Sequence, residues 1–235
     1  SVALNVTALE VGDELFGDEK YRDALWIYRI VYPRDIIEGN AQRQLEGLQR
    51  RAGWLRKSPG LLRRLIRTQE SIGELEQELK ARKEVKAYDV ELAFRVARSY
   101  FEIRRYRESR DLFYDLYRSG PQDRAEECLY LSFMSACQLQ PWERAFAIGG
   151  EYLKVYEGSS NYYDSVSLTV GQMQANLQDW TNVISGLTHA LEVHPKHEQI
   201  VECMFLVGYA SFMEEQFAAS ADWMKRMLAG YPKNA

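Results

Sequence analysis

Three histidines lie close enough along the chain to raise the question of a metal site. His189 and His194 are five residues apart, and His197 follows just after Pro195. Two ligands on one face of a helix need a spacing of four, and the proline ends a helix between these residues. We therefore predict a polar turn here, with a metal site in the loop as the alternative.

The other groups that could do chemistry are scattered. Cys128, Cys137 and Cys203 form no C-x-x-C pair, and we interpret them as small apolar residues on helix faces. The sequence contains no P-loop, no G-x-G-x-x-G, no G-x-S-x-G and no H-E-x-x-H. The sequence therefore predicts no metal, no cofactor and no enzymatic activity.

The composition favours a helical protein with a large core. Of 235 residues, 46% are hydrophobic, and only six are proline. A net charge of −4 argues against a nucleic-acid binder, and no apolar run reaches the length of a membrane span. The first residue is Ser1 and not methionine, which we interpret as a mature product or a fragment.

One short pattern recurs along the chain: an aromatic residue, two variable residues and then a small residue or valine. From the second occurrence onward, the aromatics are 36, 38 and 37 residues apart. The position nine residues upstream is small in four of the five cases. The five aromatics and their upstream positions are Tyr21 with Gly12, Tyr106 with Ala97, Trp142 with Phe133, Trp180 with Gly171, and Phe217 with Gly208.

This pattern resembles the tetratricopeptide repeat family, whose unit is slightly shorter. The resembling units span about 5–38, 90–123, 126–159, 164–197 and 201–234, and Phe133 departs from the pattern. The resemblance implies an all-α solenoid of helical hairpins in a right-handed superhelix, with each aromatic at the start of a second helix. An ordinary helical bundle is the alternative. The irregular spacing is similar to that of bacterial members.

Residues 40–88 do not follow the repeat. Leu45, Leu48, Ala52 and Leu55 share one helical face, Ser58-Pro59-Gly60 breaks the run, and Leu65, Ile72, Leu75 and Leu79 continue it. We predict a longer helical hairpin here. The organisation is then a first hairpin at 1–39, the irregular hairpin at 40–88 and four hairpins at 89–235, all in one continuous solenoid domain.

The irregular hairpin is rich in cations around its turn. A basic patch for an acidic partner or an anionic membrane surface is one interpretation. A solvated helix face, paired locally to Glu70, Glu74, Glu76 and Glu78, is the other. The patch consists of Arg50, Arg51, Arg56, Lys57, Arg63, Arg64 and Arg67.

In the resembling family, first helices line a concave groove that binds extended peptides or helices. The groove positions carried over are Phe94, Arg98, Phe101, Tyr130, Met134, Gln138, Leu168, Gln172, Asn176, Phe205, Tyr209 and Phe212. The slots that clamp a C-terminal carboxylate in some members hold Arg98, Met134, Gln172 and Tyr209 here, with no lysine. An apolar or backbone-directed mode is therefore expected.

These observations predict a scaffold or adaptor that binds a partner protein or peptide during assembly of a larger complex. The alternative is a repeat region of a longer protein whose activity lies elsewhere. Both the bacterial cytoplasm and the envelope fit, and the sequence leaves the oligomeric state open.

Overall fold

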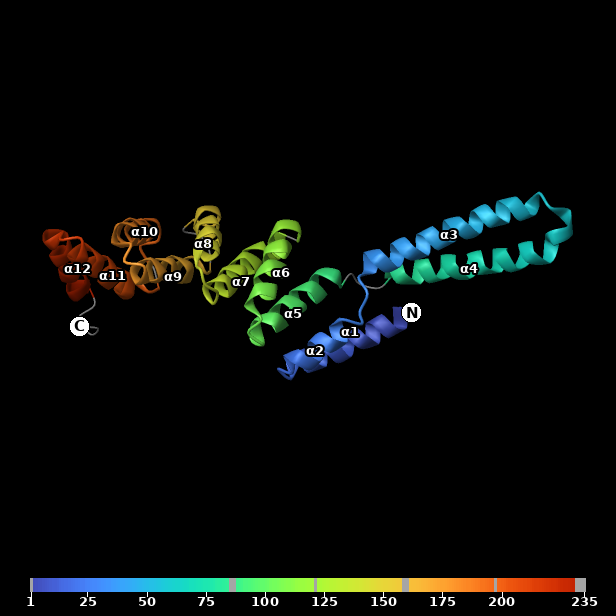
Figure 1. Cartoon of the computed structure of the whole chain (residues 1–235), viewed down its shortest axis with the longest axis horizontal. Helices are drawn as coiled ribbons and strands as arrows, with labels where there is room; N and C mark the ends of the chain where they lie inside the picture. Colours follow the sequence, from blue (N-terminus) through green and yellow to red (C-terminus); the bar gives the residue numbers. More distant parts are fainter. Residues whose placement is uncertain (1, 85–87, 121, 158–160, 197, 231–235) are drawn as a thin grey trace. The chain divides into compact units, whose positions relative to one another are not determined.

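The structure is a computed structural model that describes residues 2–84, 88–120, 122–157, 161–196 and 198–230. These residues contain α-helices and short 3-10 turns but no strand, and neighbouring helices pack in sequence order (Figure 1). The contacts group into two compact units, Ser1–Arg105 and Tyr106–Ala235, whereas the repeat pattern predicts one continuous domain. The first unit contains α1 Val2–Gly17, α2 Tyr21–Tyr28, α3 Arg34–Arg56, α4 Leu62–Glu84 and α5 Asp89–Glu102.

The second unit consists of seven α-helices in the described residues. Each packs on the next, and a core around Leu129, Phe133 and Tyr152 joins the first part of the unit. A second core, around Leu187, Cys203 and Val207, joins the last part. The helices are α6 Tyr106–Ser119, α7 Ala125–Cys137, α8 Glu143–Val155, α9 Tyr163–Asn176, α10 Trp180–Val193, α11 Ile200–Met213 and α12 Phe217–Gly230.

The recurring aromatics mark helix starts, as the sequence predicts. Four of them are the first residue of a helix, and Trp142 directly precedes α8. The residue two positions before each of these four has a positive φ of 59° to 62°. At each of these turns, the next residue donates its N–H to a carbonyl five residues back, which is the bond of a Schellman cap. The left-handed residues are Glu19, Arg104, Gln178 and Glu215.

Phe133 is large where the other repeats have a small residue, and a small residue sixteen positions later makes room for its ring. In the neighbouring repeats, a Cβ on Gly171 would lie 2.9 Å from Leu187, and one on Gly208 would lie 2.8 Å from Met224. In the α7–α8 pair the small residue is on the second helix instead, because a Cβ on Gly149 would lie 2.7 Å from the Phe133 ring. The pair thus keeps one large and one small residue but exchanges their places.

Carboxylates in the first turns of α7 and α9 make equivalent long-range bonds, which we call acidic latches. Glu126 accepts the Tyr152 hydroxyl at 3.0 Å and the N–H of Asn161 at 3.1 Å, 35 residues further on. Asp164 accepts the N–H of Glu198 at 2.7 Å, 34 residues further on. Each latch therefore ties the start of a helical pair to the segment that follows that pair.

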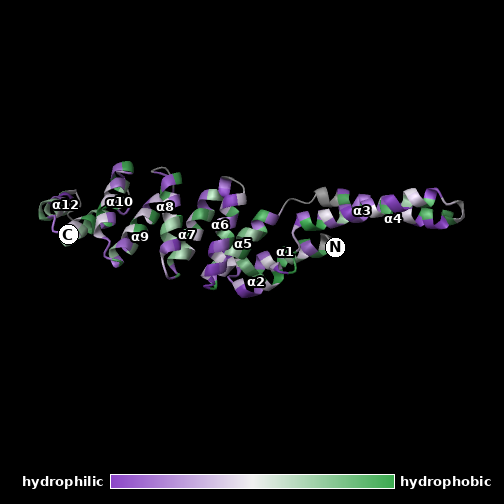
Figure 2. Ribbon diagram, turned by 45° about the horizontal axis from the view of Figure 1, so that its top comes forward, coloured by the Kyte–Doolittle hydropathy of each residue, from purple (hydrophilic) through white to green (hydrophobic). Residues whose placement is uncertain are grey.

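The irregular hairpin begins earlier than predicted. The helix α3 starts at Arg34 and not at residue 40, because Pro33 is its N-cap and α2 already ends at Tyr28. The two helices bury Ala41, Leu45 and Leu75 between them and are otherwise largely hydrophilic (Figure 2). The predicted break at residues 58–60 is confirmed as a turn with a short 3-10 helix, Pro59–Leu61.

Candidate partner-binding surfaces

The helix α11 carries an exposed aromatic stripe. Its sequence is apolar all round, so one face packs in the core through Cys203 and Val207 while the opposite face remains apolar. Phe205, Tyr209 and Phe212 follow one another at helical spacing and are 51%, 41% and 55% exposed. We call these three residues the α11 aromatic face.

The rings of this face contact one another and their neighbours. Phe205 and Tyr209 are nearly parallel, with centroids 6.4 Å apart. Trp180 meets Tyr209 edge-on at 5.7 Å, and Phe217 meets Phe212 at the same distance. These contacts hold the rings in place, so a ligand would order few side chains on binding.

Polar groups lie on the adjacent helix α9. Gln172 and Asn176 are exposed, one and two turns beyond Leu168. Leu168 packs in the same core as Cys203 and Val207 of α11. Amide side chains on one helix and aromatic rings on the next are suited to a peptide that presents both backbone and apolar side chains.

Two residues predicted to contact a partner are core residues instead. Phe94 and Leu168 are buried, so neither side chain can contact a partner in this structure. Spacing along the sequence selects a whole face at helical period, and such a face also includes residues that point into the adjacent helix. The assignment of these two side chains to the groove is therefore corrected.

The remaining predicted groove positions have less exposed apolar surface. Tyr130 and Met134 are half-buried against the α7–α8–α9 core, and Tyr130 stacks on Tyr162 at 4.1 Å. Gln138 is exposed just after α7. In the first unit, Arg98 lies over the Phe101 ring at 5.5 Å and pairs with Glu102. The largest exposed group of predicted positions on neighbouring helices is therefore on α9 and α11.

A groove between α8, α9 and α10 is a surface that the sequence did not predict. It has a volume of about 610 Å³ and an apolar floor that includes Phe146, Val170 and Leu187. Its rim carries Lys154, and it includes Glu157, which lies 2.9 Å from His189. Exposed glycines at Gly150 and Gly186 are the sequence signal that could have identified it.

The histidine cluster has a structural role in the described part of the chain. His194 Nδ1 lies 2.7 Å from Asp164 Oδ1, beside the latch, while His197 lies outside the described residues. Among the described residues, no group of three or more His, Cys, Asp or Glu side chains could hold a metal ion. No described helix has the length and apolar character needed to cross a bilayer.

The three thiols should react slowly in the folded protein. Burial raises the pKa of Cys128 to about 11 and the pKa values of Cys137 and Cys203 to about 12. At pH 8, less than about one such thiol in a thousand is ionised, against about a quarter of free cysteines. We expect Ellman's reagent to label the native protein at least about 100-fold more slowly than the protein in urea. Rapid labelling of even one thiol in the native protein would contradict this expectation.

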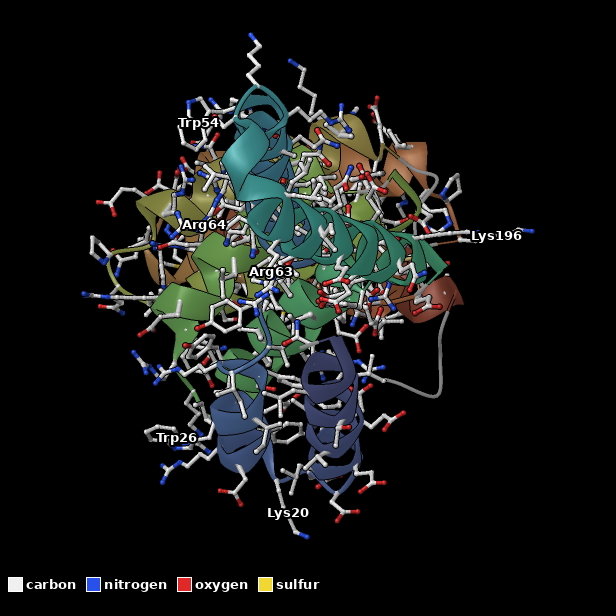
Figure 3. All side chains as sticks on the ribbon, turned by 90° about the vertical axis from the view of Figure 1, so that its right-hand side faces the viewer. Lys20, Trp26, Trp54, Arg63, Arg64 and Lys196 are labelled. Atoms are coloured by element: carbon white, nitrogen blue, oxygen red, sulfur yellow. The ribbon has the colours of Figure 1, made fainter. Side chains whose placement is uncertain are left out.

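The seven cations of the basic patch surround the turn of the α3–α4 hairpin. All seven are exposed, and Arg50 donates to the Glu46 carbonyl at 3.4 Å. None of the seven forms an ion pair with any described residue, so they are solvent-exposed cations here, without the local pairing to Glu70, Glu74, Glu76 and Glu78. Figure 3 shows Arg63 and Arg64 near the end of this hairpin, together with Trp54.

Comparisons with known proteins assign neither a family nor a function to the chain. No protein-family model matches the chain, and a search of curated proteins gives no significant match.

Proposed function

We propose that this chain is a scaffold of the tetratricopeptide type, that its helical pairs stack as a right-handed solenoid, and that it acts by binding and not by catalysis. Three features support the repeat: the aromatic helix starts, the four Schellman caps at one repeat position, and the two latches. Buried cysteines and a histidine held by Asp164 support the absence of catalysis.

The observation that carries the binding role is the α11 aromatic face. Three large rings within about two helical turns stay exposed although they are fixed by ring contacts. Isolated exposed apolar residues are ordinary on a protein surface, but a contiguous group of aromatics favours an interaction site. Aromatic rings supply much contact area with little loss of side-chain entropy.

The partner should be a protein segment with apolar side chains and an accessible backbone. The rings would cover the apolar side chains, while Gln172 and Asn176 could bond the peptide groups. Two of the slots that hold lysine or asparagine in carboxylate clamps hold Gln172 and Tyr209 in this unit. A free C-terminal carboxylate is therefore not the proposed ligand.

We expect the double variant Phe205→Ala with Tyr209→Ala to lose at least about tenfold in peptide affinity, since aromatic anchors contribute most of the energy at such sites. Peptides would be selected on the wild-type protein from a random displayed library. Their affinities would then be measured by fluorescence anisotropy.

The matched control is Val155→Ala with Leu228→Ala, which removes exposed apolar surface on α8 and α12, away from this face. It should bind the peptides like the wild type. A folded Phe205→Ala and Tyr209→Ala protein with unchanged affinity would move the binding role to another surface, such as the groove between α8 and α10.

A second candidate is the repeat region of a longer protein whose activity lies elsewhere. Ser220 is the one buried residue among the described residues of α12, while Phe217 and Leu228 are exposed. A further helical pair could cover this apolar surface. A partner segment that loses affinity on the Leu228→Ala substitution, and not on loss of Phe205, would favour this candidate.

A further inference from the structure

The tip of the α3–α4 hairpin, residues 50–67, has an unusual charge. The stretch 47–69 contains seven cations and no Asp or Glu. With a net charge of −4 for the chain and +7 for the tip, the remaining residues carry −4 − 7 = −11. An anionic surface would therefore attract the tip and repel the rest of the protein, which restricts contact to the tip.

Large apolar side chains are exposed in the same place. Trp54, Leu62 and Ile66 are 62%, 63% and 47% exposed, although the neighbouring Ala52 and Leu55 are buried. With a rise of about 1.5 Å per residue, all three lie within about 8 Å, along the helix axes, of the turn at residues 58–61. Cations and exposed apolar groups thus occupy the same end of the hairpin.

We propose that this tip docks on an anionic lipid bilayer. The cations would pair with lipid phosphates and carboxylates, and the three apolar side chains would enter the boundary between headgroups and acyl chains. Tryptophan is enriched at this depth because its ring is amphipathic. The apolar groups come from both helices, Trp54 from α3 and the other two from α4, and a fluid bilayer can close around a tip on both sides.

Two other anionic partners would contact only some of these side chains. The phosphates of a nucleic acid would satisfy the cations but offer no apolar phase for Leu62 and Ile66. One acidic protein surface would satisfy the cations on one side of the hairpin. A bilayer uses both the charges and the apolar groups.

The test is flotation of the full chain with vesicles of phosphatidylcholine alone or with about one-third phosphatidylserine. We expect binding to the anionic vesicles only, with an affinity that falls as salt is added. Arg63→Glu with Arg64→Glu should reduce the partition constant at least about 30-fold, because each basic residue near the surface contributes about a factor of five to ten. Trp54→Ala should reduce it roughly 5- to 10-fold.

The control is Arg107→Glu with Arg118→Glu, which makes the same charge change at exposed positions of α6. It should bind the anionic vesicles like the wild type. The proposal is overturned if the wild type does not float with anionic vesicles, or if the Arg63→Glu and Arg64→Glu protein binds them equally well. Retention of a single-stranded oligonucleotide without any vesicle binding would overturn it in favour of a nucleic acid.

Discussion

Replacing Phe133 with alanine is expected to lower the free energy of unfolding by about 3–5 kcal/mol. The ring is fully buried in the core that joins α7, α8 and α9, so its removal leaves a cavity and loses apolar burial. Gly149→Leu should also destabilise the protein, because a side chain there collides with the Phe133 ring and with Val170.

The two substitutions together should lower the free energy of unfolding by less than the sum of their separate effects. The double variant Phe133→Ala with Gly149→Leu reproduces the arrangement of the next repeat, where the small residue is Gly171 and the large one is Leu187. We expect a favourable coupling of about 1–3 kcal/mol in a double-mutant cycle, measured by urea unfolding. The remaining contact with Val170 should keep the recovery partial. Additive effects would show that the two positions do not exchange roles.

Asp164→Ala is expected to destabilise the protein by about 3 kcal/mol. The carboxylate is buried and accepts hydrogen bonds from the Glu198 N–H and the His194 side chain, each at 2.7 Å. Its removal leaves donors without an acceptor and detaches the start of α9 from the segment after α10. Asp164→Asn keeps the size and one acceptor oxygen, so a loss of about 1–2 kcal/mol is expected.

Asp111→Ala provides the comparison for the latch, since Asp111 is exposed and, in the described part of the chain, pairs only with its neighbour Arg110 at 2.8 Å. Its effect should stay within about 0.5 kcal/mol of the wild type. Urea unfolding followed by circular dichroism measures all three variants. An Asp164→Ala protein as stable as the Asp111→Ala protein would mean that the latch does not contribute to stability.

The sequence predicts the helices better than the contacts between them. Aromatics such as Trp180 and Phe217 mark helix starts because they recur with small residues at fixed offsets. The early start of α3 at Arg34 was missed, since the first repeat was expected to keep a full second helix. The latch at Asp164 leaves no local pattern, because its partners lie about one repeat away.

The surfaces were predicted in part. Helical spacing brings Phe205, Tyr209 and Phe212 to one face, and the structure shows them exposed together. The spacing of residues along a helix does not show which side the neighbouring helices cover. For that reason the assignment of Phe94 and Leu168 to the exposed groove is wrong, because both are buried. The exposed Trp54 beside the cations had no periodic signal, because it falls between two buried positions of the same helix.

Because α3 and α4 pack chiefly against each other, the length of their hairpin can change without altering the packing of the other helices. Ala41, Leu45 and Leu75 are buried where the two helices meet, and α3 and α4 pack chiefly against each other. Seven residues added to each helix would preserve the register of this seam and move the turn about 10 Å further from Pro33. The hairpin can therefore act as a ruler, whose reach could change in evolution by whole heptads while the repeats keep their packing.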